Sequence, residues 1–155
     1  MRASPAAPTA PNPAFAATTR RFIMEMPIAA YFGFRITDIG PGFLEITQPY
    51  RRELCYIDGI FQAGAVGTIA DFAGAGACVT MLPEGWGGAT ADYTIKLLAP
   101  ATGENLVARG RLIQFGRTLS VAAADVFCVK DDKETLCATA LITARTFPNA
   151  ATSTS

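Results

Sequence analysis

The sequence predicts an α+β fold in which a strongly curved antiparallel sheet wraps around one long buried helix. Two observations support this prediction: a series of strand-like runs separated by turn residues, and one nearly uncharged stretch at residues 60–82. Consecutive strands joined by short loops form antiparallel sheets, and a helix that is apolar on nearly all sides needs protein around it. With 155 residues, 50% of them hydrophobic and 17% charged, the chain can bury the core of one domain.

The two ends of the chain are expected to lie outside this domain. Residues 1–19 are mostly Ala, Pro and Thr, a composition that resists packing, and residues 148–155 form a polar tail. Prolines interrupt every apolar run in the leader that could form the core of a signal peptide. These are Pro5, Pro8, Pro11 and Pro13. We therefore expect a disordered leader at 1–19, one domain over 20–147, a flexible tail and no secretion.

Helix and strand signals follow one another in a definite order through the domain. Residues 19–26 form an amphipathic helix candidate, with Phe22, Ile23 and Met26 on one side. Two strands then flank Gly40-Pro41-Gly42, a sequence typical of hairpin turns. After the long helix and a loop at 83–88, four more strands are expected as a meander. The strand ranges are 34–39, 43–47, 91–98, 105–115, 119–129 and 135–146.

A single carboxylate, Asp71, lies in the middle of residues 60–82, where no other residue is ionised at neutral pH. Burying an acid among Ala, Gly, Val and Ile costs free energy unless the carboxylate is hydrogen-bonded or used. Burial also raises the pKa of a carboxyl group and strengthens it as a base, so Asp71 is a candidate catalytic residue. The alternative is an Asp that faces solvent at the edge of a sheet. Asp71 and several glycines also argue against a membrane span over this segment.

The composition narrows the chemistry that the chain can perform. It contains no histidine, which removes Ser-His-Asp and Cys-His systems, imidazole bases and most zinc or non-haem iron sites. Acid–base chemistry must therefore come from a carboxylate, a Tyr, a Lys, a Cys or bound water. No metal and no cofactor is expected.

Charge and cysteine usage limit the partners and the compartment. The 13 basic and 13 acidic residues cancel, which gives no electrostatic footprint for nucleic acid or for an anionic membrane surface. The four cysteines show no CxxC or zinc-like spacing, and we expect them to be reduced thiols in a cytoplasmic protein. They are Cys55, Cys78, Cys128 and Cys137.

Three segments resemble, in order and at matching spacing, the hotdog-fold acyl-CoA thioesterases of the phenylacetate-pathway (PaaI-like) type. The first is GIFQAG at 59–64 with Ala70 and Asp71, similar to the family's G-x-x-H-[GA]-G-x6-D. The second is DYTIKLLAPA at 92–101, and the third is GRLIQFGRTL at 110–119. The resemblance extends over 20–147. It implies a hotdog fold, hydrolysis of an acyl-CoA thioester, and a homodimer or dimer of dimers with the site at the subunit interface.

The resemblance also implies roles for individual residues. Asp71 is the catalytic carboxylate, a base or a nucleophile, and it acts from the helix of the partner subunit. Gln62 stands where the family has His, and Tyr56 falls where the family has Asn. A Gln amide donates a hydrogen bond but cannot carry a proton. Thr90 falls where relatives have a hydroxyl residue that holds the attacking water, with an ordinary strand Thr as the alternative.

The residues themselves support a compatible mechanism. Helix N-termini offer unpaired N–H groups and the positive end of the helix dipole, so the N–H groups of Ala63 and Gly64 are candidates to polarise the thioester carbonyl. Three aromatic residues are candidates to line the acyl pocket, although aromatic residues beside a buried helix also form ordinary core. They are Tyr56, Phe61 and Phe72.

Coenzyme A carries phosphates, so a basic residue is expected at the mouth of the site. Arg117, with Thr118 in the same turn, is the first candidate, and Arg109 and Arg111 are second choices. The alternative for each is a surface arginine without a ligand.

The alternative function is a hotdog domain that binds acyl-CoA, or only assembles, without hydrolysing anything. Gln62 and Tyr56 in place of His and Asn favour this alternative, whereas the retained Asp71 speaks against it. A dehydratase or hydratase of the same fold would use a catalytic His, which the chain lacks.

Overall fold

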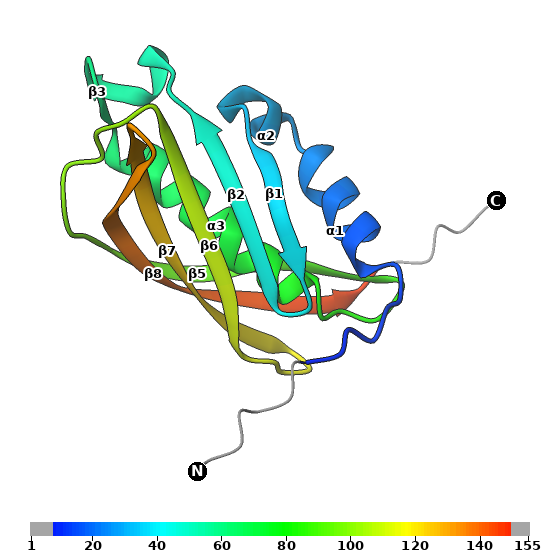
Figure 1. The fold of residues 1–155 in the computed structure, drawn as a ribbon. Coiled ribbons are helices and arrows are strands. Elements are labelled where there is room, and N and C mark those ends of the chain that lie inside the picture. The colour runs from blue at the N-terminus through cyan, green and yellow to red at the C-terminus, as the bar shows by residue number, and fades with distance from the viewer. Residues whose placement is uncertain (1–7, 150–155) are drawn as a thin grey trace, which may run out of the picture.

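A six-stranded sheet wraps around one long helix in the computed structural model, which describes residues 8–149 (Figure 1). The helices are α1 (Phe15–Met24), α2 (Pro27–Phe32), α3 (Ala63–Val79) and a short 3-10 turn, η1 (Arg52–Leu54). The strands of the large sheet are β1 (Arg35–Gly40), β2 (Phe43–Pro49), β5 (Trp86–Leu97), β6 (Asn105–Gln114), β7 (Leu119–Lys130) and β8 (Lys133–Pro148). Two short strands, β3 (Cys55–Ile57) and β4 (Ile60–Phe61), pair beside the start of α3.

The strand order in the large sheet is β1-β2-β6-β7-β8-β5, with every neighbouring pair antiparallel. The sequence predicted a meander of the last four strands, and this is wrong for β5, which pairs with β8 instead of β6. Strand β5 comes directly after α3 in the chain. It lies on the far side of the helix and closes the curved sheet around it (Figure 1). The connection at 98–104 then crosses to β6, which leaves β5 as an edge strand.

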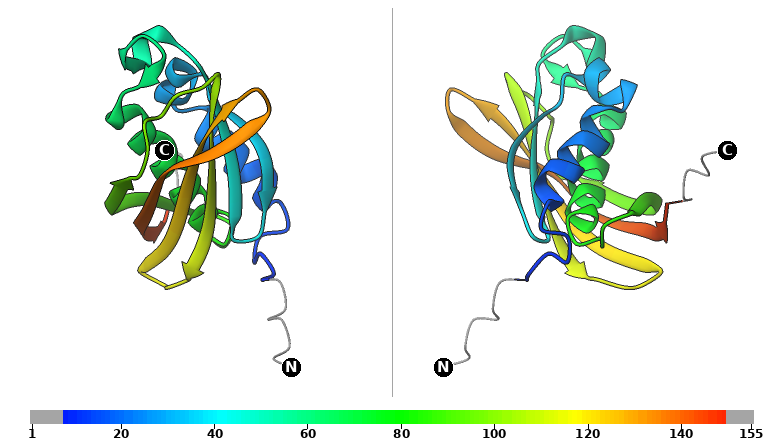
Figure 2. Two further views of the ribbon diagram at one scale, coloured as in Figure 1. Left: turned by 60° about the vertical axis from the view of Figure 1, so that its left-hand side comes forward. Right: turned by 90° about the vertical axis from the view of Figure 1, so that its right-hand side faces the viewer.

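The long helix α3 lies directly against the sheet because small residues face each other at the contact. A Cβ atom added to Gly110 of β6 would lie 1.9 Å from the carbonyl oxygen of Ala73 in α3. A Cβ on Gly76 would lie 2.2 Å from a methyl carbon of Leu44 in β2. The helix covers the concave face of the sheet, and α1 packs against α3 from the other side (Figure 2). Protein on both sides explains why α3 has no polar face.

The predicted fold class is confirmed: a curved antiparallel sheet holds a long buried helix in the manner of a hotdog fold. The helix is shorter than the apolar segment, since β4 and Gln62 precede it and Thr80 ends it. None of the helices in residues 8–149 is long and apolar enough to cross a membrane.

Two predicted boundaries differ from the structure. Helix α1 begins at Phe15, so residues 15–19 belong to a helix and not to the leader; the side chain of Asn12 accepts a hydrogen bond from Ala14 N–H just before it. Strand β5 begins at Trp86, inside the predicted loop, because Gly87 and Gly88 pair with β8. Of the predicted leader and tail, residues 1–7 and 150–155 lie outside the described residues, and Pro148, the first residue of the predicted tail, is the last of β8.

Helix α2 was not predicted from the sequence. It follows α1 after a short break, with Pro27 at its first position and Gly33 in the left-handed conformation (φ 72°) at its end. Both residues are ordinary boundary signals for a helix. Phe22, Ile23 and Met26, predicted on one side of a helix at 19–26, do line one cavity with residues of α3, but α1 ends at Met24 and Met26 is the residue before α2.

Candidate functional site

The carboxylate of Asp71 lies between α3 and the edge strand β5. Its side chain is half-buried, and its Oδ1 atom accepts a hydrogen bond from Thr90 Oγ1 at 2.7 Å. Burial raises the pKa of the Asp71 carboxyl above its usual 3.8, and the hydrogen bond from Thr90 opposes part of that rise. The structure thus brings together two of the residues that the sequence singled out, and makes one of them a stronger base.

A bulge in β5 aims Thr90 at the helix. Thr90 pairs with Ala144 and Asp92 pairs with Thr143, so Ala91 is an extra residue without a partner across the ladder. A bulge of this kind reverses the alternation of side chains along a strand. As a result Thr90, before the bulge, and Tyr93, after it, both face α3.

Tyr93 is a residue of the site that the sequence did not reveal. A Cβ atom added to Gly67 of α3 would lie 3.3 Å from the Tyr93 hydroxyl oxygen, so Gly67 leaves room for that hydroxyl against the helix. Position 67 is midway between the start of α3 and Asp71. Tyr93 faces α3 because of the bulge at Ala91, and no residue pattern in β5 predicts a bulge.

The start of α3 forms the other half of the candidate site. Gln62 caps the helix, because its side-chain Oε1 accepts a hydrogen bond from Gly64 N–H. The backbone carbonyl of Gln62 accepts from Ala65 and Val66. Within the described residues, Ala63 therefore has the N–H group of this turn that is left without a protein acceptor. The cap also leaves the amide nitrogen of Gln62 free to donate to something else.

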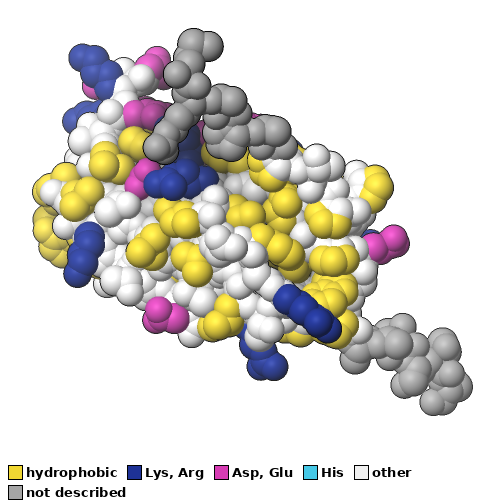
Figure 3. All heavy atoms as spheres, turned by 90° about the horizontal axis from the view of Figure 1, so that it is seen from below, with side chains coloured by type: hydrophobic (Ala, Val, Ile, Leu, Met, Phe, Trp, Pro, Cys, Tyr) yellow, Lys and Arg dark blue, Asp and Glu magenta, His cyan; other side chains and the backbone are white. Residues whose placement is uncertain are grey.

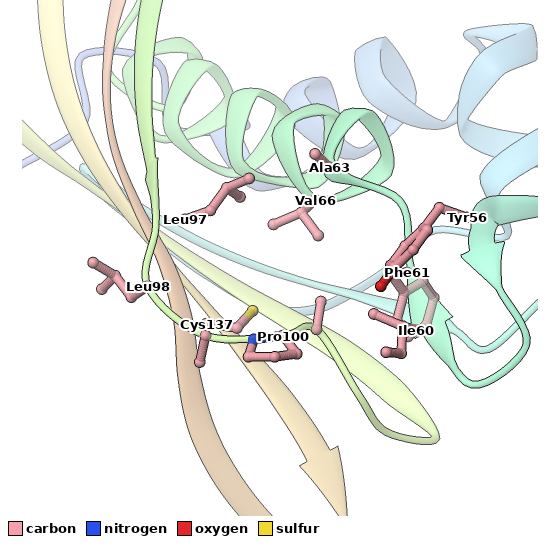
Figure 4. Close-up of a pocket in the computed structure, with 11 residues that line it drawn as sticks. Tyr56, Ile60, Phe61, Ala63, Val66, Leu97, Leu98, Pro100 and Cys137 are labelled. Atoms are coloured by element: carbon pink, nitrogen blue, oxygen red, sulfur yellow. The ribbon is translucent and has the colours of Figure 1, made fainter.

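A cavity of about 390 Å³ opens in front of this helix start. Figure 4 shows Ala63 at one side of the cavity, Tyr56 and Phe61 from β3 and β4 beside it, and Leu97 from β5 opposite. Tyr56 is 63% exposed, whereas Phe61 is buried at 3% and packs against Tyr50. Two of the predicted pocket residues therefore lie together next to the first turn of α3.

A second cavity, of about 240 Å³, opens beside Asp71 and is lined by residues of α1, α3 and β5. Phe72, predicted as an acyl-pocket residue, lies in this cavity and not in the first. The cavity itself could not be predicted from the sequence, because it depends on how α1 packs across α3.

The two halves of the site are separated within one chain. Ala63 and Asp71 are eight residues apart on α3, which corresponds to about 12 Å along the helix axis. A single thioester carbonyl cannot reach both groups at hydrogen-bond distance in one subunit.

The predicted phosphate-binding residues lie elsewhere. Arg117 and Thr118 are in the turn between β6 and β7, at the opposite end of the sheet from β3 and β4 (Figure 1). Arg109 is engaged on the outer face of the sheet, where it pairs with Glu45 and Glu134 at 2.7 Å and stacks on Phe127. That second choice is wrong, because the guanidinium already has two carboxylate partners.

Arg111 also faces outward, beside a shallow cavity on the outer face of the sheet. Its position is therefore remote from Asp71. Residues 8–149 contain no group of three His, Cys, Asp or Glu side chains that could hold a metal ion.

No known family model and no curated protein matches this sequence. Solved structures do. A thioesterase family protein from Silicibacter pomeroyi is 31% identical, with a TM-score of 0.85 over 87% of this chain and 99% of its own. The PaaI protein of the E. coli phenylacetic acid degradation operon is 18% identical, with a TM-score of 0.76 over 88% and 95%. A thioesterase from Haemophilus influenzae is 20% identical, with a TM-score of 0.75 over 86% and 91%.

Proposed function

Because the chain belongs to the thioesterase family, whose hotdog fold it shares, we propose that it hydrolyses an acyl-CoA thioester to a free acid and coenzyme A. One observation above all supports this proposal: the half-buried Asp71, held by Thr90, stands at an apolar cavity next to an exposed strand edge. A carboxylate with a raised pKa in such a place is suited to activate water.

In the proposed reaction Asp71 acts as a general base. It takes a proton from a water molecule while the water oxygen attacks the thioester carbonyl carbon and the carbonyl oxygen becomes an oxyanion. The oxyanion collapses, the carbon–sulfur bond breaks, and the proton passes from Asp71 to the leaving sulfur of coenzyme A. Thr90 donates its hydroxyl proton to Asp71 and can at the same time accept a hydrogen bond from that water. Direct attack by the Asp71 carboxylate, through an anhydride that water then hydrolyses, uses the same residues.

The start of α3 supplies the oxyanion site in this proposal. The N–H group of Ala63 and the amide nitrogen of Gln62 are the donors, since Gly64 N–H already donates to the Gln62 side chain. The positive end of the helix dipole adds to their effect. The earlier expectation that Gly64 N–H is a direct donor is thereby changed: Gly64 orients Gln62.

A second copy of the chain completes the site. Strand β5 has a partner strand on one edge only, and Tyr93 (43%), Leu97 (54%) and the following Leu98 (54%) are exposed apolar residues along it. Antiparallel pairing of two β5 strands about a two-fold axis also turns one α3 against the other. The Asp71 of one subunit then faces the Ala63 of its partner, which removes the separation of about 12 Å within a chain.

Further assembly and the phosphate contacts are also part of this proposal. The outer face of β6, β7 and β8 exposes Ile113, Leu119 and Leu141, each at 50% or more, which suits a dimer of dimers. Seen from below, hydrophobic side chains are spread over the middle of the surface, with single charged side chains between and around them (Figure 3). The backbone carbonyl of Thr118 accepts a hydrogen bond from the N–H group of Thr146 in β8, and Thr146 pairs with β5. Arg117 and Thr118 therefore lie near β5, and two-fold pairing of two β5 strands carries them toward the start of the partner's α3.

The alternative is a protein that binds acyl-CoA without hydrolysing it, and Gln62 and Tyr56 in place of the family's His and Asn favour that alternative. The raised pKa of Asp71 favours hydrolysis. All four cysteines are free thiols, in keeping with the cytoplasmic location that we include in the proposal.

The test is release of free thiol from a panel of aryl, short-chain, medium-chain and long-chain acyl-CoAs. We expect turnover of at least one class, and its loss in Asp71→Asn. Binding of acyl-CoA by calorimetry with no thiol release from any of them would contradict hydrolysis and support the alternative.

A further inference from the structure

The cavity beside Asp71 has one polar end and one apolar end. Its polar side chains are Asp71 and Thr90, which are hydrogen-bonded to each other. The rest of its wall comes from Gly and apolar residues of α1, α3, β5 and β8 and from Met26 between α1 and α2, and the largest of these side chains are Phe22, Met26 and Phe72. A ligand whose reactive carbonyl lies at Asp71 therefore places its tail among groups that offer no hydrogen bond.

A separate cavity of about 210 Å³ lies at the end of α3 away from its start. It is bordered by polar and charged side chains of α1, among them Arg21 and Glu25, and by Trp86 at the beginning of β5. The two cavities have only two lining residues in common, Phe22 of α1 and Val79 of α3. These two side chains are thus the wall between an apolar space and a polar one.

We propose that Phe22 and Val79 set the maximum length of the acyl group that this protein accepts, by closing the apolar cavity at the end remote from Asp71. The inference rests on the proposed function, because it takes Asp71 as the position of the thioester. It also defines the substrate class: acyl groups of medium length with no polar substituent.

The cavity volume gives the expected length. An engineered protein cavity of about 150 Å³ binds benzene, which corresponds to about 25 Å³ per carbon atom. On that scale a cavity of about 240 Å³ holds roughly eight to ten carbon atoms. A longer chain has to displace Phe22 or Val79 and then enters a space bordered by Arg21 and Glu25, where its carbon atoms gain less from burial.

Phe22 is the residue at which this wall can be opened. Phe22 is 37% exposed, so it is not part of the fully buried core, whereas Ile23 of α1 is 2% exposed and lies against Gly76 of α3. Truncating Phe22 joins the two cavities and nearly doubles the space available to the acyl group. It should cost less folding free energy than truncating the buried Ile23.

The experiment measures kcat/KM for saturated acyl-CoAs from butyryl to palmitoyl. In the parent protein we expect the value to rise about fourfold for each added CH2 that is buried, up to octanoyl or decanoyl, and then to fall. Phe22→Ala should move the maximum up by about two to four carbon atoms. Val79→Ala should move it in the same direction by less. Ile28→Ala, an exposed residue of α2 outside both cavities, is the matched control and should keep the parent profile.

Folding is checked by circular dichroism and thermal unfolding, with Phe22→Leu as a milder variant that shifts the profile less. The inference is overturned if folded Phe22→Ala and Val79→Ala both retain the parent's maximum. If the parent hydrolyses no acyl-CoA, the proposed function fails separately. The same series of acyl-CoAs is then titrated by calorimetry in the parent and in Phe22→Ala. A longer preferred chain in the variant supports the wall, and identical binding profiles refute it.

Discussion

The middle of α3 and its first turn differ in how complete they are within one chain. Around Asp71 the partner hydroxyl of Thr90 is in place at 2.7 Å, and an apolar cavity adjoins the carboxylate. At the first turn, Gln62 and Gly64 satisfy each other, Ala63 is exposed, and the cavity in front is bordered by the half-exposed Leu97 of an edge strand. The hydrogen-bonded pair in the middle of α3 is therefore complete within one chain, whereas the first turn borders an open cavity and a strand edge at which another molecule can bind.

The largest effect is expected for Asp71→Asn, which tests the carboxylate in the middle of α3 because it keeps the shape of the side chain and removes the base. We expect kcat to fall by about 10²- to 10⁴-fold, the range for loss of a general base. The measurement is thiol release from the best acyl-CoA, with acyl-CoA binding as the control for an intact site. Turnover equal to that of the parent would exclude Asp71 as the catalytic carboxylate.

Ala63→Pro tests the first turn without disturbing the helix. Proline is well tolerated at the first helical position, and Gln62 before it has extended backbone angles (φ -71°, ψ 145°) that proline allows. The change removes the backbone N–H group proposed for the oxyanion and leaves the Gln62 amide, so kcat should fall by about 10²- to 10³-fold. The melting temperature should be unchanged. A normal kcat in this variant would show that Ala63 N–H takes no part.

Mixing the two inactive variants tests whether the two regions come from different subunits. In heterodimers of Asp71→Asn and Ala63→Pro, one site carries both changes and the other carries neither. After random exchange at equal amounts, about one quarter of the parent activity should return for a two-fold dimer. Activity that stays at the level of the separate variants, in dimers shown by light scattering to have exchanged, would place both groups in one subunit.

Gln62 separates the capping role from the proposed donor role. Gln62→Ala should lose the cap, worth about 1 kcal/mol of stability, as well as about 10- to 100-fold in rate. Gln62→Ser restores a side chain that caps helices well but lacks the amide donor. It should recover the stability measured by urea unfolding and leave the rate low. If Gln62→Ser is as active as the parent, the amide does not contact the thioester.

The smallest expected effect is on stability as a function of pH. Because burial raises the pKa of Asp71 above 3.8, the folded protein binds its proton more readily than the unfolded chain. Stability therefore falls as the pH rises from 3.8 through the raised pKa, and Asp71→Asn should be at least as stable as the parent at pH 7. The advantage should vanish on acidification below 3.8. The pH profile of kcat/KM should show the same ionisation on its acidic limb and no imidazole limb near neutrality. A parent more stable than Asp71→Asn at pH 7 would contradict burial as the dominant influence.

Sequence patterns were sufficient for the elements that are long and strongly periodic. The buried helix, the hairpin at Gly40–Gly42 and the strands β6 to β8 were predicted closely, because alternation and turn residues are local properties. The position of β5 beside β8 was not predicted, because pairing with a distant strand depends on how the sheet closes around α3.

The same division applies to the site. Asp71 could be selected from the sequence because it is the one ionised residue of its segment, and Gln62 and Ala63 because the helix was expected to begin there. Tyr93 and the wall of Phe22 and Val79 could not, because a bulge and the packing of α1 bring them to the site. Their side chains are of types that core positions commonly contain.

The contact between Gly110 and the carbonyl of Ala73 has a consequence for how this sequence can diverge. Where helix and strand meet backbone to backbone, their separation is set by main-chain atoms as long as position 110 remains glycine. Core side chains on either side can then be exchanged over many generations without carrying Asp71 away from β5. A fold retained with the E. coli PaaI protein at 18% identity and a TM-score of 0.76 is what such an anchor allows. The side chains that line the surrounding cavities can change while the Asp71 carboxylate keeps its place beside Thr90.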